Sequence, residues 1–173
     1  NIQAIQTQIA RYQRTPVQFM AVTKYATLEQ TIAIINSGVT LLGENKVQSA
    51  LEKITTLNNP TLTWHLIGHL QTNKAKKAVE NFHTIQTVDS LKLLEKLNTE
   101  AANHHLTLPV LLEVNIGKEP QKYGFIEDDI HHLHTQLFNF SHIKINGIMV
   151  IPPASPDPEK TRPYFQHTKK LYD

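Results

Sequence analysis

The sequence predicts an α/β fold, a parallel-stranded barrel of the TIM (β/α)8 type with about six of its eight βα units present. Short apolar runs of strand length alternate with stretches of helical spacing along the whole chain, and strand starts recur roughly every 25 residues. The alternative closure is an open doubly wound sheet, which would need a glycine-rich turn after its first strand. No such turn follows the first apolar run. The barrel is therefore favoured.

The first half of the chain predicts an N-terminal helix followed by strand–helix units. Residues 2–12 carry isoleucines and a tyrosine at helical spacing. Thr27 and Gln30 fit a capping box that opens the next helix, and Gly38 fits its end. Asn45 is expected to cap the helix after that. Near-continuous apolar runs, which suit strands buried on both faces, predict strands at 17–24, 39–45 and 62–68.

The second half repeats this pattern. Apolar residues at helical spacing predict a helix from 91 to 101 and another near 126–138 that includes Leu137. A last helix is expected to begin after Pro158 and to continue to Asp173. Further apolar runs predict strands at 84–90, 109–117 and 144–153.

No linker or low-complexity stretch interrupts this alternation, so residues 1–173 are expected to form a single barrel domain. A complete barrel usually needs at least about 200 residues. The chain also begins without methionine and stops inside a helical pattern. We therefore expect a barrel truncated at the C-terminus by about a quarter, as a fragment or processed product.

Composition excludes several classes of protein. The formal net charge is only +2, which argues against nucleic-acid binding, and the basic stretch at 74–77 lacks neighbouring aromatic residues. The absence of cysteine excludes disulfides and thiolate chemistry. No apolar stretch reaches the roughly 20 residues of a membrane span, so a cytoplasmic protein is expected. His131 and His134 would share a helix face, but no third ligand stands at zincin spacing, so no metal site is predicted.

Polar residues stand where the carboxyl ends of the predicted strands would meet, at the end of a barrel that carries functional groups. Lys24, Asn45, His65 and Asn115 are among them. A partly desolvated lysine has a lowered pKa and becomes a nucleophile toward aldehydes, which suggests Schiff-base chemistry for Lys24. Alternatively, Lys24 only extends from a strand end into water. The spacing of the residues alone does not decide between these two interpretations of Lys24.

A resemblance to a known family decides between these two interpretations of Lys24. It is carried by six segments that occur together, in this order and at this spacing: "AVTKYAT", "LLGENKVQSALEKI", "WHLIGHLQTNKAK", "TVDSLKLLEKLN", "VLLEVNIGKEPQKYGF" and "INGIMVIPP". From about residue 17 to 170, the chain resembles the pyridoxal-phosphate homeostasis protein family, the single-domain relatives of the alanine racemase barrel. The resemblance implies the fold type III barrel of the alanine racemase N-terminal domain. Its implied cofactor is pyridoxal 5′-phosphate.

Transferred position by position, the resemblance implies a set of cofactor-binding residues. Lys24 would hold the cofactor as a Schiff base, and Asn45 would lie beside the cofactor ring. His65 and Met149 would line the same pocket. Lys122 matches a lysine near the cofactor mouth and is expected to be accessory.

The sequence also departs from the family pattern. His69 stands where the family usually has proline or another small residue, and Tyr123 stands where it often has serine. The family continues into segments that supply the phosphate cradle and the partner of the pyridine nitrogen, and these are absent from this sequence. We therefore expect this chain alone to hold the cofactor weakly.

The resemblance implies a non-catalytic protein of vitamin B6 homeostasis that influences amino-acid and keto-acid balance. The alternative is a pyridoxal-phosphate enzyme of the alanine racemase type. Racemisation needs an acid or base on each face of the substrate carbon, and the racemase takes its tyrosine from a separate β domain of a partner chain. This chain has no room for such a domain, so turnover is not expected. A third hypothesis is that the protein is a scaffold that binds no ligand. Expected partners are pyridoxal phosphate and apoenzymes that require it, with no nucleic acid or membrane, and the protein is expected to be a monomer.

Overall fold

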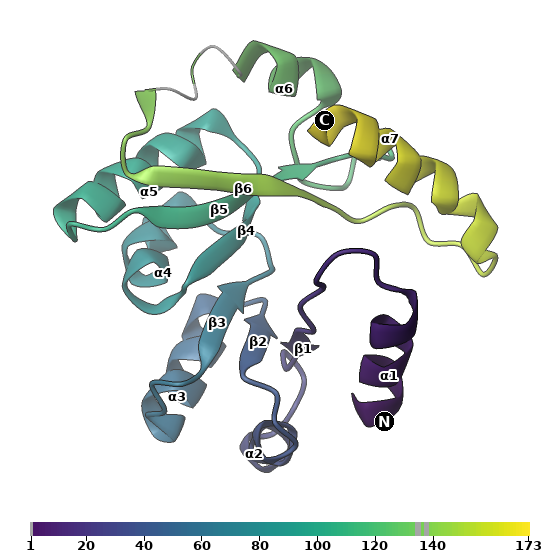
Figure 1. Cartoon of the computed structure of the whole chain (residues 1–173). Helices are drawn as coiled ribbons and strands as arrows, with labels where there is room; N and C mark the ends of the chain where they lie inside the picture. The colour runs from purple at the N-terminus through teal and green to yellow at the C-terminus, as the bar shows by residue number, and fades with distance from the viewer. Residues whose placement is uncertain (1, 134–135, 137–138) are drawn as a thin grey trace.

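The computed structural model describes residues 2–133, 136 and 139–173. Its centre is a six-stranded sheet in the order β1-β2-β3-β4-β5-β6, with every neighbouring pair parallel (Figure 1). Sequential order is what successive βα units of a barrel produce, whereas a doubly wound sheet reverses its order partway. The prediction of a partial barrel is therefore confirmed. The strands are β1 (Ala21–Val22), β2 (Leu41–Glu44), β3 (Thr63–Leu66), β4 (Thr84–Val88), β5 (Leu108–Val114) and β6 (Ile143–Val150).

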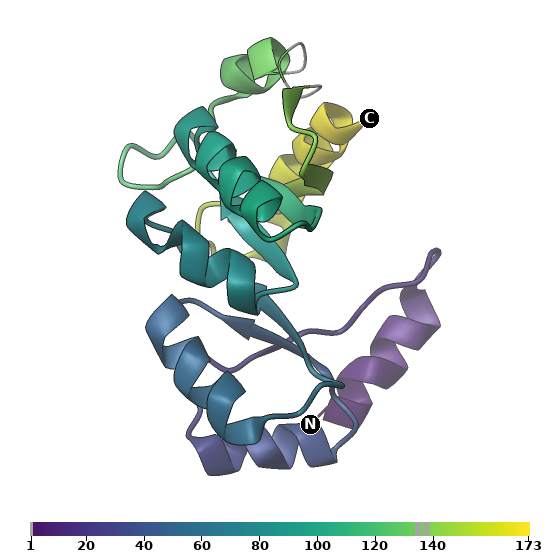
Figure 2. The same ribbon diagram turned by 90° about the vertical axis from the view of Figure 1, so that its left-hand side faces the viewer.

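Helices α3, α4 and α5 cover one face of the curved sheet, while α1 and α7 lie near its two edge strands (Figures 1 and 2). Each crossover helix joins consecutive parallel strands, as a βαβ unit requires. The α-helices are α1 (Ile2–Tyr12), α2 (Leu28–Asn36), α3 (Val47–Leu57), α4 (Ala75–Asn81), α5 (Leu91–Asn103), α6 (Glu127–Leu133) and α7 (Arg162–Tyr172). Short 3-10 helices are η1 (Thr72–Lys74) and η3 (Pro158–Lys160).

The hydrophobic core lies between the sheet and these helices. Successive strand residues face opposite sides, and on β5 every second residue is buried while those between are only half-buried. Trp64 of β3 is 3% exposed and belongs to this core. The other face of the sheet, called the inner face here, is less covered. It carries the half-buried residues Pro109, Leu111 and Glu113 of β5.

A register shift between β5 and β6 decides which residues lie side by side on the inner face. Val110 pairs with Ile145, but Leu111 pairs with Gly147, so β6 carries one extra residue at this point. Beyond the shift, Glu113 lies opposite Met149. The two side chains therefore share one row at the carboxyl end of the sheet.

Strands β2 to β6 are each two or three residues shorter than their predicted runs, and three further differences concern β1, the start of α3 and the end of α6. β1 has two residues instead of the predicted run 17–24, since only Ala21 and Val22 pair with β2. The N-cap of α3 is Lys46, not Asn45, and it makes no side-chain capping bond. α6 ends at Leu133, and Leu137 of the longer predicted helix lies outside the described residues. The capping box of Thr27 and Gln30 is confirmed.

Within the described residues, no helix combines the length and apolar character needed to cross a membrane.

Candidate functional site

The residues predicted to bind the cofactor lie at or near the carboxyl ends of the strands. Lys24 and Asn45 follow β1 and β2, His65 lies within β3, and Met149 lies within β6. Lys122 belongs to the loop after β5. Because parallel strands end at one edge of the sheet, all five belong to the same rim. In the described part of the chain, no hydrogen bond or ion pair joins any two of these side chains directly.

Lys24 comes directly after Thr23, which belongs to a buried polar network that fixes the end of β1. Thr23 Oγ1 donates to Glu44 Oε1 at 2.7 Å. Lys53 Nζ donates to the same oxygen at 2.7 Å and to the main-chain oxygen of Thr23 at 2.6 Å. Both Thr23 and Glu44 are 0% exposed, so the backbone immediately before Lys24 is held from the core side.

The Lys24 side chain itself is exposed, with its Nζ 5.2 Å from the centroid of the Tyr25 ring. Lys24 and Lys53 line a pocket of about 440 Å³ together with the start of α2 and residues of α3. His65 and Met149 do not line this pocket. An exposed amine next to an open pocket can reach an aldehyde without unfolding of the strand end.

Asn45 is held by a close approach between two loops. A Cβ atom added to Gly68 would lie 2.2 Å from the main-chain oxygen of Asn45, so only glycine fits at position 68. Asn45 lines a pocket of about 270 Å³ with His69, Gln71 and Lys74. The loop after β2 is therefore fixed against the loop after β3.

His65 lies on the half-buried face of β3 and pairs with Gln86 of β4. The distance from Gln86 Nε2 to His65 Nδ1 is 2.9 Å, and because the amide nitrogen donates, Nδ1 accepts. Burial lowers the pKa of His65 below its ordinary value, and the neighbouring His83 lowers it further. The imidazole is therefore neutral at neutral pH, with its proton on Nε2.

We expect stability to fall more steeply with decreasing pH in the wild type than in the His65→Gln variant. The unfolded chain protonates this histidine near pH 6.5, whereas the folded protein keeps it neutral to lower pH. The contribution of the neutral ring is complete above pH 6.5 and is lost as the pH falls through that value toward the lowered pKa. Urea unfolding at about pH 7.5 and about pH 5.5 measures the difference, and equal slopes would contradict it.

Lys122 connects the loop after β5 to the end of β6. Its Nζ lies 2.5 Å from Glu119 Oε2 and donates to the main-chain oxygens of Ile151 and Pro152 at 3.3 and 3.4 Å. The amine thus lies just beyond the strand that carries Met149. Asn115, which the sequence also placed on the rim, uses its side-chain amide to bond Glu119 and Lys122 of its own loop.

Sequence reasoning named His69 and Tyr123 but missed Glu113 and the pairing of His69 with Asp89 at the ends of the strands. His69 Nδ1 lies 2.8 Å from Asp89 Oδ2, and the His69 ring stacks on Tyr123 with centroids 3.7 Å apart. Burial raises the pKa of the Glu113 carboxyl above its ordinary value, the Asp89 charge raises it further, and His69 partly offsets this. Glu113 Oε2 is buried without a hydrogen-bond partner. In the sequence, the position of Glu113 inside the apolar run "VLLEV" is the signal that could have identified it.

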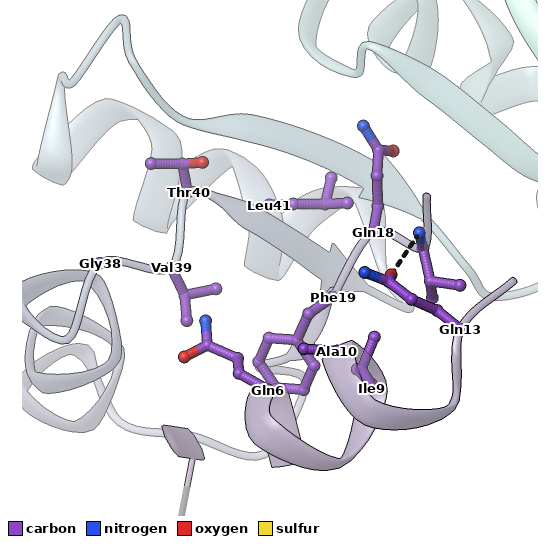
Figure 3. A pocket seen from close by; sticks show the side chains of 11 residues that line it. Gln6, Ile9, Ala10, Gln13, Gln18, Phe19, Gly38, Val39, Thr40 and Leu41 are labelled. Atoms are coloured by element: carbon purple, nitrogen blue, oxygen red, sulfur yellow. Dashed lines mark hydrogen bonds between the residues drawn. The ribbon is translucent and has the colours of Figure 1, made fainter. Parts of the chain in front are cut away.

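A separate pocket of about 410 Å³ lies at the opposite, amino-terminal end of β1 and β2 (Figure 3). α1 forms one wall, and Phe19, Val39 and Leu41 contribute apolar surface. Val17 N donates to Gln13 Oε1 at 3.2 Å at its edge. None of the predicted cofactor-binding residues lines this pocket.

The described residues contain no group of three or more histidines, cysteines or acids placed to hold a metal ion. Of the two histidines considered from the sequence, His134 lies outside the described residues.

Comparisons with known sequences agree on one family. The model of the family described as "Alanine racemase, N-terminal domain" matches residues 1–173. A pyridoxal phosphate homeostasis protein of Pasteurella multocida is 33% identical over 168 residues, covering 96% of this chain and 72% of that protein. Another, from Aquifex aeolicus, is 36% identical over 138 residues, covering 80% of this chain. The alignment spans only 60% of the Aquifex protein's length.

Solved structures give the same result. PipY of Synechococcus elongatus PCC7942, solved without PLP, is 35% identical with a TM-score of 0.87, covering 97% of this chain and 79% of that one. PipY with PLP bound is 34% identical with a TM-score of 0.86. Alanine racemase of Clostridium difficile 630 is 17% identical with a TM-score of 0.77, which shows a shared fold alone. The chain therefore belongs to the alanine racemase N-terminal domain family and, within it, to the pyridoxal phosphate homeostasis proteins.

Proposed function

We propose that this protein is a non-catalytic binder of pyridoxal 5′-phosphate in vitamin B6 homeostasis, with Lys24 as the residue that takes the cofactor's aldehyde. The carrying observation is the exposed Lys24 amine at the end of β1, on backbone fixed by Thr23, Glu44 and Lys53. The structural likeness to PipY with PLP bound supports the choice of cofactor. Residues 1–173 act as one cofactor-binding barrel domain.

The remaining predicted residues fit this cofactor chemically. Asn45 and the neutral His65 offer hydrogen-bonding groups without charge next to an aromatic ring, and Met149 offers a polarisable apolar surface. Lys122 is accessory, since its amine is bound to Glu119 and to the loop after β6. When bound, the cofactor supplies an aldehyde that exchanges between amines. The protein's own contribution is to hold, orient and release it.

A carrier is favoured over a racemase by a specific observation. Racemisation requires a second acid or base on the far side of the substrate carbon, commonly a tyrosine. Tyr25 is 86% exposed beside the Lys24 amine, and Tyr123 is stacked on His69, so neither is fixed opposite Lys24. The Aquifex and Pasteurella proteins, at 36% and 33% identity, are named homeostasis proteins, whereas the Clostridium difficile racemase is 17% identical. We further propose a monomer that passes the cofactor to apoenzymes that require it.

Borohydride reduction after addition of pyridoxal phosphate is expected to place a pyridoxyl group on Lys24. Lys24→Ala and Lys24→Arg are expected to lose that label, the second while keeping the positive charge. Lys122→Ala is the matched control and is expected to keep it. Peptide mapping by mass spectrometry locates the label. A label found chiefly at Lys122 or Lys53 would refute the assignment.

The same samples test for turnover. Incubation of the loaded protein with L-alanine is expected to yield no D-alanine and no decarboxylated product on chiral chromatography. Racemised product that depends on Lys24 would replace the carrier with the enzyme.

A further inference from the structure

Glu113 is a charged group of the rim whose chemistry the proposed site leaves unused. It lies on the inner face of β5, opposite Met149 of β6. Its Oε2 atom is buried and has no hydrogen-bond partner. A buried carboxyl oxygen without a partner is unfavourable, and such a group in a native structure calls for an explanation, such as a catalytic role or a bound ion.

The charged groups around Glu113 do not satisfy it. From the end of β4, Asp89 repels it. From the loop after β3, His69 attracts it but bonds Asp89 at 2.8 Å and stacks on Tyr123. From β6, the residue in register is the uncharged Met149. The amine of Lys122, in the loop after β5, is bound to Glu119 at 2.5 Å.

We propose that Glu113 recognises the ammonium group of a primary amine that displaces the cofactor's aldehyde from Lys24. This inference rests on the proposed function, since a carrier must pass its aldehyde to another amine. The amine arrives as an ammonium ion and must lose a proton before its nitrogen can attack. A half-buried carboxylate attracts the cation and accepts that proton.

The exchange balances without any further reactant. The bond between the amine nitrogen and the aldehyde carbon forms, and the bond between Lys24 Nζ and that carbon breaks. The proton that the incoming ammonium gives to Glu113 is matched by the proton that the departing lysine amine takes up. Asp89 adds negative charge beside Glu113 and so favours a cationic ligand over a phosphate or carboxylate.

The first test uses the cofactor-free protein and follows the Glu113 carboxyl carbon by NMR, assigned by its loss in Glu113→Gln. Ethylammonium chloride at about 100 mM is expected to lower the pKa of Glu113 relative to the same concentration of sodium chloride, because a bound cation favours the carboxylate. Inorganic phosphate is expected to leave it unchanged. Glu119, whose carboxylate already pairs with Lys122, is the internal control. A pKa that ethylammonium does not move, or that phosphate raises, overturns the proposal.

The second test measures release of pyridoxal phosphate from the loaded protein at increasing ethylamine concentrations. Glu113→Gln is expected to slow amine-dependent release about tenfold or more, chiefly by raising the amine concentration needed for half-maximal rate. Glu113→Asp is expected to restore part of the amine-dependent release. Borohydride labelling of Lys24 in the wild type and in Glu113→Gln distinguishes a failure of the proposed function from a failure of this inference. If Lys24 is not labelled in the wild type, the proposed function fails. If it is labelled and Glu113→Gln releases like wild type, this inference alone fails.

Discussion

Replacing Lys53 by methionine is expected to lower the free energy of unfolding by about 3–5 kcal/mol. The change removes the cation that pairs with Glu44 at 2.7 Å, while the carboxylate stays 0% exposed. Glu44 Oε2 already lacks a hydrogen-bond partner, so little remains to compensate the buried charge. The main-chain oxygen of Thr23 also loses its donor. Urea unfolding followed by circular dichroism measures the loss.

Arg162→Met is the matched control for Lys53→Met. It also removes a cation 2.7 Å from a glutamate, but Arg162 and Glu159 are both exposed on the surface. Exposed ion pairs are screened by water, so stability is expected to change little. A Lys53→Met variant as stable as Arg162→Met would show that Glu44 does not depend on its lysine. The double variant Glu44→Gln with Lys53→Met is expected to recover part of the loss, because no uncompensated charge remains buried.

The order of the elements could be predicted from the sequence because the signals are local. Each apolar run packs against helices that lie next to it in the chain, and the run at 109–117 became the regular strand β5. The length of β1 could not be predicted in this way, since only two residues of its apolar run pair with β2 in the folded sheet. The N-cap of α3 moved from Asn45 to Lys46 for a tertiary reason, the close approach of Gly68 to Asn45.

The site was predictable only in part, for the same reason. Strand ends fix which side chains reach the rim, so Lys24 could be proposed from its position after an apolar run. The pairing of His69 with Asp89 joins residues 20 positions apart and depends on loop geometry. Glu113 Oε2 lacks a hydrogen-bond partner because none of the groups that folding brings next to it donates to it. A sequence states which groups are present, but it does not state which of them remain unpaired after folding.

Leu97→Ala is expected to lower the free energy of unfolding by about 2–5 kcal/mol. Leu97 is 0% exposed in α5, within the core between the helices and the sheet, and truncation leaves a cavity there. Domains of this kind have a total stability of about 5–15 kcal/mol, so this is a large fraction. Ile5→Ala on α1, where the side chain is 43% exposed, is the control and is expected to cost less than about 1 kcal/mol.

Comparing Leu97→Ala with Lys53→Met separates stability from the geometry of the site. Leu97 lies on α5, which packs against α4 and β5, so its loss weakens the whole fold but leaves the end of β1 in place. Lys53 bonds the residue just before Lys24, so its loss weakens the fold and also frees that backbone. At a temperature where both variants stay folded, Leu97→Ala is therefore expected to retain wild-type pyridoxyl labelling at Lys24, while Lys53→Met is expected to lose most of it. Equal labelling in the two variants would mean that the buried network supports the fold without positioning the lysine.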